Sequence, residues 1–444
     1  MLGVFRVFSP LRSTPGRVGV LIFLLLLSTV GREPVSGQEA RYARELSTIM
    51  ADAGVQRALA LIEASDPEAQ EDLVYLTEIP APPFMEEERA KAFAELLATA
   101  GADSVRIDEV GNVLAFRAGR RVDRTVVLGG HMDTVFPEGT DVTVRIRGDT
   151  LFAPGVGDDT RGLVVVLSVL RALVAAEIET DANLLFLGSV GEEGLGDLRG
   201  VKHFFREDGP DADAFIEIDG SGMGSIVNMG LGSVRYRITF RGNGGHSWGA
   251  FGLVNPAHAL GRAIETFAVV ADSLTRTGPR TSFNVGRIGG GTSINSIPFE
   301  AWMEVDMRSE SPEGLDAIAE AFLAAVHSAV DSENQARRGG DPIRVEVDQI
   351  GLRPSGEIDP STPLVQRAME VTKHFGEEPR LSRSSTNSNI PISMGIPAVT
   401  IGRGGAGGDN HSPGEWWLNQ DGYLAIQRAL LLLVAEAGLS GADG

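Results

Sequence analysis

Four short apolar segments of this chain are each soon followed by acidic or imidazole side chains. They are residues 126–128 before His131, 184–187 before Glu192 and Glu193, 214–218 before Asp219, and 398–401 before His411. None of them alternates apolar with polar residues, which indicates strands covered on both faces, as in a mostly parallel sheet. Parallel strands end at one edge of a sheet, and ligands bind at that edge in open α/β folds. The pattern predicts an α/β domain that gathers these side chains in one cleft.

A fifth acidic position precedes a helix instead of following a strand. Residues 151–157 form a glycine-containing loop that leads into Asp158 and Asp159, and an apolar helix is expected from Thr160 to Ala176. Aspartate is a common helix N-cap, so one of the two has an ordinary structural explanation. The second aspartate needs another explanation, and a functional role in the same cleft would provide it.

Composition limits the chemistry that these side chains can perform. The 444 residues are too many for one ordinary core, so we expect at least two domains. The chain has no cysteine, which excludes disulfides and thiolate metal sites. The formal net charge of -21 argues against a nucleic-acid partner, because a phosphate backbone would be repelled. Any metal must be held by His, Asp and Glu.

The region from 232 to 348 has a different hydropathy pattern. Its strands alternate polar and apolar residues, as antiparallel strands with one wet face do. The order strand, helix, strand, strand, helix, strand is typical of a ferredoxin-like α+β domain. We therefore expect an insertion at 232–348 that divides the first domain into 38–231 and 349–444. Residues 31–50 are expected to be a polar lead-in with little to bury, and 141–146 a half-exposed strand.

The N-terminus has the anatomy of a secretory signal peptide. Three arginines precede an apolar run at 18–30, and small residues before Gln38 offer a cleavage site, which predicts a signal over 1–37. The apolar run is shorter than the roughly 20 residues of a spanning helix. We expect a secreted or periplasmic protein without stable membrane association after cleavage. An uncleaved membrane anchor is the alternative.

The predicted cleft has the donors of a metal site. Carboxylates and imidazoles without thiolates suit Zn²⁺, Co²⁺ or Mn²⁺. Five ligands are too many for one tetrahedral zinc with an open position, but they suit two metals that share a carboxylate, as in aminopeptidases. A further carboxylate that is free of metal could act as the general base.

The chain resembles a known family, the dinuclear zinc peptidases and deacylases that include glutamate carboxypeptidase, aminoacylase, succinyl-diaminopimelate desuccinylase and peptidase T. The resemblance runs from Ala81 to the C-terminus. Its motifs are Gly130-His131-Met132-Asp133-Thr134, Gly157-Asp158-Asp159, Glu192-Glu193, Asp219 and His411, and in the insertion Gly245-His246-Ser247, residues 290–298 and residues 305–308.

The resemblance implies a role for each of these residues. His131, Asp158 and Asp219 would hold one metal ion. Asp158, Glu193 and His411 would hold the other, so that Asp158 is the bridge. Glu192 would be the general base that activates a metal-bridging water, and Asp133 would orient the His131 ring. A cis peptide between Asp158 and Asp159 is also implied.

The inserted domain would act as a lid and a dimerisation domain. The resemblance implies a homodimer in which His246 supplies an oxyanion donor, often to the other subunit's site. Asn295 and Arg308 would contact the substrate. Most of the remaining histidines are expected to be structural or on the surface.

The function expected first is hydrolysis of an amide bond in a small peptide, by an enzyme of the dipeptidase, tripeptidase or carboxypeptidase type. It would use two divalent metal ions, with Zn²⁺ as the first choice. One alternative is an N-acyl amino acid deacylase with the same chemistry. Another is a catalytically inactive binding module, which usually lacks the base or a ligand. Asp219 is more like the tripeptidase branch, and 384–389 replaces a segment that often reads Gly-Thr-Asp, so the substrate stays open.

Overall fold

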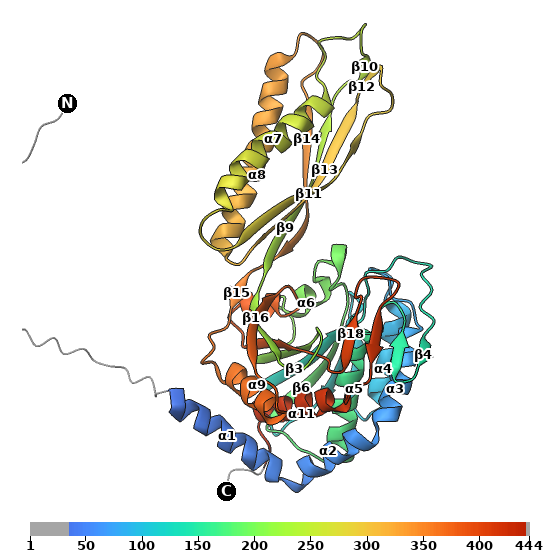
Figure 1. The fold of residues 1–444 in the computed structure, drawn as a ribbon, viewed down its shortest axis with the longest axis vertical. Helices are drawn as coiled ribbons and strands as arrows, with labels where there is room; N and C mark the ends of the chain where they lie inside the picture. The colour runs from blue at the N-terminus through green and yellow to red at the C-terminus, as the bar shows by residue number, and fades with distance from the viewer. Residues whose placement is uncertain (1–34, 441–444) are drawn as a thin grey trace, which may run out of the picture.

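The computed structural model describes residues 35–440 and is built around a mixed nine-stranded sheet (Figure 1). The strands follow the order β1 (Ser104–Ile107), β2 (Val113–Arg117), β6 (Ala182–Ser189), β3 (Arg121–His131), β7 (Ala214–Ile218), β17 (Ala398–Ile401), β8 (Ser225–Gly230) and β15 (Gly356–Glu357), with β16 (Arg380–Ser384) beside β8. Strand β2 runs antiparallel to β1 and β6, and β8 runs antiparallel to β17 and β15 but parallel to β16. The predicted α/β sheet is confirmed.

The four apolar segments of the sequence are adjacent parallel strands in the order β6, β3, β7 and β17. His131 pairs with Ser189, and Ala398 pairs with Phe215. Every residue of β6, β7 and β17 is buried, which explains why the segments do not alternate. Their carboxyl ends therefore share one edge.

Helices cover this sheet and form one continuous core with it. Helices α5 (Thr160–Ala175), α9 (Pro363–His374) and α11 (Tyr423–Ala437) pack against its central strands, and α4 (Glu87–Thr99) packs against β1 and β2. The other helices of this domain are α2 (Ala53–Ala64), α3 (Asp66–Thr77), α6 (Arg199–Phe204), α10 (Asn389–Ser393) and the short 3₁₀ turn η1 (Gly194–Gly196). None of the helices in the described range 35–440 is long and apolar enough to cross a membrane.

The expectation of a polar lead-in at 31–50 is wrong. Helix α1 (Val35–Ala51) packs against α9 and α11 and buries Tyr42, Leu46 and Ile49. Its apolar residues are sparse, so the sequence pattern is weak, but they fall on one face. The predicted signal peptide lies mostly outside the described residues, and its expected cleavage site falls in the first turn of α1.

The inserted domain spans Gly232–Arg353 and has its own core. Its antiparallel sheet has the order β11 (Thr281–Gly290), β13 (Glu300–Ser309), β9 (Gly232–Arg241) and β14 (Arg344–Arg353). Helices α7 (Pro256–Leu274) and α8 (Pro312–Ala336) pack on this sheet and on each other. Strand β14 extends beyond the expected boundary at 348, because a register shift between Gln349 and Gly351 breaks its alternation while pairing with β9 continues.

A two-stranded ladder of β10 (Gly245–His246) and β12 (Ser296–Ile297) marks the far end of the inserted domain. Figure 1 shows it at the end remote from the large sheet, and we call residues 245–253 and 291–299 the tip. A separate small sheet has the order β18 (Ala406–Gly408), β19 (Trp416–Leu418), β5 (Thr150–Phe152) and β4 (Arg145–Arg147). The strand expected at 141–146 is therefore wrong in extent, because only its end pairs, and β4 is exposed.

Candidate metal centre and active site

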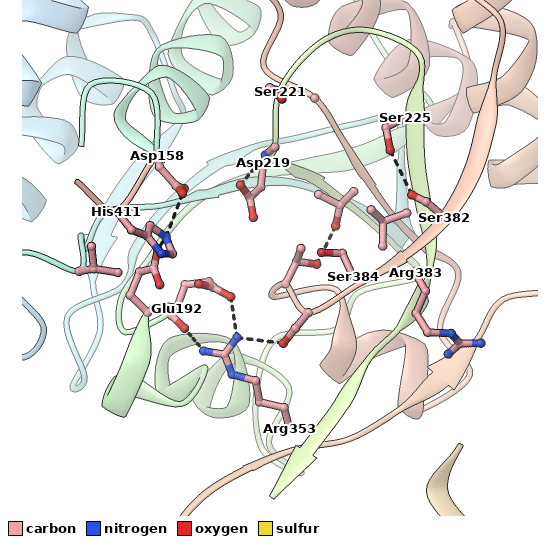
Figure 2. Close-up of a pocket in the computed structure, with 18 of the residues that line it drawn as sticks. Asp158, Glu192, Asp219, Ser221, Ser225, Arg353, Ser382, Arg383, Ser384 and His411 are labelled. Atoms are coloured by element: carbon pink, nitrogen blue, oxygen red, sulfur yellow. Dashed lines mark hydrogen bonds and ion pairs between the residues drawn. The ribbon is translucent and has the colours of Figure 1, made fainter. Parts of the chain in front are cut away.

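The strand ends bring the predicted ligands together. Ligand atoms of His131, Asp158 and Asp219 lie within 4.8 Å of one another, and so do those of Asp158, Glu193 and His411. The two sets share Asp158 and are the same sets that the family resemblance implies. Figure 2 shows Asp158 and His411 facing each other, with Asp219 and Glu192 beside them. The roles of these residues as ligands remain predictions.

Three side-chain distances define the cluster. His131 Nε2 lies 3.4 Å from Asp158 Oδ1. His411 Nε2 lies 3.3 Å from Asp158 Oδ2 and 3.0 Å from Glu193 Oε1. Asp158 therefore offers one carboxylate oxygen to each side, as a bridging ligand must. Hydrogen bonds with Asp158 and Glu193 raise the pKa of His411 to about 10, so a metal ion would have to displace a proton from this ring.

The loop that carries Asp158 is held by a residue far along the chain. Glu415 accepts backbone N–H groups from Gly155 at 2.9 Å, Gly157 at 3.0 Å and Asp158 at 2.8 Å. The peptide bond between Asp158 and Asp159 is cis. Asp159 occupies the N-cap position of α5, but its carboxylate accepts from the His131 N–H at 3.2 Å instead of capping the helix.

Asp133 contacts both the predicted ligand His131 and the glutamate pair. The His131 Nδ1 atom lies 3.0 Å from the main-chain oxygen of Asp133 and 3.7 Å from its carboxylate. The carboxylate instead accepts the backbone N–H groups of Glu192 at 2.9 Å and Glu193 at 2.8 Å. Asp133 thus fixes the glutamate pair more directly than it orients the imidazole.

A buried arginine balances part of the negative charge. Arg403 Nη1 lies 3.2 Å from Asp219 Oδ1 and 3.4 Å from Asp158 Oδ1, and only 3% of the residue is exposed. Burial would raise the pKa of Asp158, but Arg403 and the two histidines hold it well below its usual value. Burial and the charge of Asp158 raise the pKa of Asp219 despite Arg403. The cluster therefore holds more carboxylate than one guanidinium neutralises.

The predicted base has a cationic partner of its own. Arg353 Nη1 donates to Glu192 Oε1 at 3.0 Å, and both side chains are buried. Burial raises the pKa of Glu192 to about 8, against the lowering effect of Arg353. A third grouping, His131 with Glu192 and Glu193, also lies within 4.8 Å. Glu192 Oε1 is bonded to Arg353, and the role of Glu192 as the general base stays a prediction.

These groups line a cavity of about 720 Å³. The cluster forms one end, and hydroxyl side chains from β8, β16 and the following loop form the other. The lining includes Asp158, Glu192, Glu193, Asp219, His411, Ser225, Ser382, Ser384, Ser385, Thr386 and the arginines 235, 308, 353 and 383. The cavity is large enough for a small peptide and offers cations for a carboxylate.

Of the three residues predicted on the inserted domain, only Arg308 lines this cavity. Its Nε donates to Asp306 at 2.8 Å. His246 and Asn295 are exposed at the tip. The ring of His246 accepts from the backbone of Trp248 at 3.2 Å, and Asn295 is bonded to Ser293 at 2.7 Å. One chain alone does not bring these two residues to the cavity.

Divalent metal ions fit the donors present. Each set offers imidazole nitrogen and carboxylate oxygen, the ligands of Zn²⁺ and related ions, and leaves room for a non-protein ligand. The carboxylate charge that Arg403 does not neutralise also favours the binding of cations at this cluster. His131, Asp158 and Asp219 would hold one ion, and Asp158, Glu193 and His411 the other.

Comparison with known proteins agrees with this geometry. The sequence profile described as "Peptidase family M20/M25/M40" matches residues 127–435. The chain belongs to this family. It is therefore a hydrolase of a family whose profile covers the whole predicted ligand set.

Two sequence relatives and one solved structure are similar to this chain. A Pyrococcus abyssi protein described as a LysW-lysine/LysW-ornithine hydrolase is 27% identical over 77% of this chain and 86% of its own. Succinyl-diaminopimelate desuccinylase of Corynebacterium glutamicum is 25% identical over 74% of this chain and 86% of its own. The crystal structure of aminopeptidase PepT from Bacillus cereus superimposes with a TM-score of 0.66 at 22% identity, covering 83% and 98% of the two chains, and shows the shared fold.

Sequence reasoning missed Arg403, Glu415 and Arg353. Arg403 stands just after the fourth buried strand, so the rule that found the other strand-end residues could have found it too. Glu415 follows His411 closely, but an isolated glutamate carries no signal of three backbone contacts. Arg353 lies at the end of β14, and nothing in the sequence links it to Glu192.

Proposed function

We propose that the protein hydrolyses an amide bond in a small peptide that carries a free carboxylate. The observation that carries the proposal is the pair of ligand sets that share Asp158, next to Glu192 in an arginine-lined cavity. When bound, two divalent ions, first of all Zn²⁺, would lower the pKa of an attacking water and polarise the carbonyl.

The chain's own residues supply proton transfer and binding. Glu192 takes the proton of the attacking water and passes it to the leaving amine. Arg308 lines the cavity, and its guanidinium suits a substrate carboxylate. Asp133 keeps the glutamate pair in place through its two backbone contacts.

We further propose a homodimer formed through the inserted domain. His246 and Asn295 lie on a tip that also exposes Trp248, Phe251 and Ile294. An exposed apolar group next to polar site residues suits insertion into another subunit. His246 would then donate to the developing oxyanion, and Asn295 would contact the substrate.

A panel of substrates tests the proposal. Metal-analysed protein is incubated with dipeptides, tripeptides and N-acyl amino acids, each with a free or an amidated C-terminus, and release of amine is followed. We expect peptides with a free carboxylate to be cleaved and their amides to be poor substrates. Equal turnover of both forms would remove the carboxylate requirement, and no turnover of any compound would remove the peptidase assignment.

The second candidate is a deacylase of N-acyl amino acids. It is favoured by the likeness to a desuccinylase, whose substrate is also an amide. The same panel distinguishes the two, because a deacylase cleaves N-acyl amino acids faster than dipeptides of similar size.

We propose in addition that the protein is exported. The support is the arginine-flanked apolar run in the first 37 residues. N-terminal sequencing of the protein from its native host tests this. We expect a mature chain that begins near Gln38, and an intact Met1 on a cytosolic protein would contradict export.

A further inference from the structure

The two strands that join the inserted domain to the large sheet both contact the segment that carries Glu192. We call residues 192–198 the base loop. Strand β9 carries the chain into the inserted domain at Gly232, and β14 carries it out at Arg353. The base loop follows β6 and lies against the roots of both strands.

Arg353 makes the central contact. Its Nη2 donates to the main-chain oxygen of Glu192. Its Nη1 donates to Glu192 Oε1 at 3.0 Å and to Ser385 Oγ at 3.0 Å. Figure 2 shows the guanidinium directly below Glu192. One planar group thus fixes both the backbone and the carboxylate of the predicted base.

Two further contacts tie the base loop to the same strands. Asp197 accepts the Leu352 N–H of β14, with both oxygens 3.0 Å from the nitrogen. Arg235 of β9 donates to the Gly194 oxygen at 2.8 Å. On the opposite side, Asp133 holds the backbone of the glutamate pair. The loop is therefore held between the segment that follows β3 and the inserted domain.

We propose that Arg353 is a positioning residue for Glu192, and that it acts with Asp197 to clamp the base loop onto the root of the inserted domain. Arg353 does not contact the substrate or the metal ions in this role. It sets the place from which Glu192 exchanges protons, so its loss lowers turnover rather than substrate binding. The catalytic consequence rests on the proposed function, whereas the clamp itself does not.

Kinetics of four variants test the proposal on the full, metal-loaded chain. Arg353→Met should lower kcat about 100-fold, because small misplacements of a catalytic group have effects of this size. KM for a peptide cleaved by the wild type should change less than about threefold, and metal content should not change. The kcat of Arg353→Lys should be at least about tenfold higher than that of Arg353→Met, since lysine restores a cation but not the paired contact.

Asp197 offers a variant outside the cavity. It has a left-handed backbone with φ 53, which glycine adopts freely, so Asp197→Gly removes the side chain without strain. We expect kcat to be about tenfold lower than in the wild type, because a partly released base loop misplaces Glu192 less than the loss of Arg353 does. Lys202 pairs with Asp197 from the other side, and Lys202→Met, which leaves the Leu352 contact intact, is the matched control with unchanged kinetics.

Hydrogen exchange of the peptide that covers the base loop gives a readout that needs no activity. Arg353→Met and Asp197→Gly should both exchange faster there than the wild type and Lys202→Met. A raised KM with normal kcat in Arg353→Met would overturn the proposal and make Arg353 a substrate contact. Lost metal in that variant, or wild-type kinetics in Asp197→Gly, would also overturn it. If the wild type cleaves nothing while exchange changes as expected, the proposed function fails and the clamp stands.

Discussion

The carboxyl edge of the large sheet and the tip of the inserted domain both carry predicted site residues, but in opposite environments. At the sheet edge, His131 and Glu192 are buried and every predicted ligand has a charged neighbour within the same chain. At the tip, His246 and Asn295 are exposed, and the hydrogen bonds described for them stay within the tip. The difference teaches that one chain brings its predicted metal ligands and base together, whereas the predicted oxyanion donor would need a second subunit to reach a cavity.

The largest expected effect lies at the sheet edge. Glu192→Gln should keep the shape of the side chain and the metal content but lower kcat about 1,000-fold, within the usual range for a general base. The measurement is turnover of the best peptide, with metal analysis of the same sample. Near-normal turnover by a fully loaded variant would show that another group takes the proton.

A smaller loss is expected at the tip. His246→Ala should lower kcat about 100-fold, as loss of one oxyanion donor does, without loss of metal. Mixing Glu192→Gln with His246→Ala chains sharpens the comparison. Active mixed dimers are expected, because one site in each would have both a base and a donor. If mixtures stay inactive after subunit exchange, the tip does not serve the partner's site.

Arg308 lies between the two regions, on the inserted domain but in the cavity. Arg308→Met should raise KM for carboxylated peptides about tenfold, as expected for one lost charge-assisted contact, and leave kcat nearly unchanged. Amidated peptides serve as the control and should not respond. An equal rise in KM for carboxylated and amidated peptides would show that Arg308 does not bind the substrate carboxylate.

The smallest effect concerns the stability of the metal-free sheet edge. Burial raises the pKa values of Glu192 and Glu217 to about 8, from 4.5 when unfolded. The folded state therefore binds more protons than the unfolded state between these values, and stability falls as pH rises through this window. We expect the Tm of chelator-treated protein to fall from pH 5 to pH 8, and added Zn²⁺ to offset the fall. A Tm that rises with pH would show that these carboxyls ionise readily.

The sequence allowed the sheet edge to be predicted much better than its supports. His131, Asp219 and the glutamate pair each follow a buried strand, so a local pattern places them. Arg403 was within reach of the same rule. Glu415 and Arg353 act through contacts with residues far away in the sequence, which no local pattern encodes. Helix α1 was missed because its few apolar residues give little periodicity, and the extent of β14 was hidden by its register shift.

Glu415 also bears on the order in which the protein is made. It holds the Asp158 loop across more than half of the chain, and the parallel strand β17 is synthesised only after the entire inserted domain. The central core and the ligand set therefore stay incomplete until the last part of the chain emerges, although the inserted domain already has its own core. Contacts of such long range form slowly. Chains that end before His411 would lack one predicted ligand, so we expect hydrolytic activity only when synthesis is nearly finished.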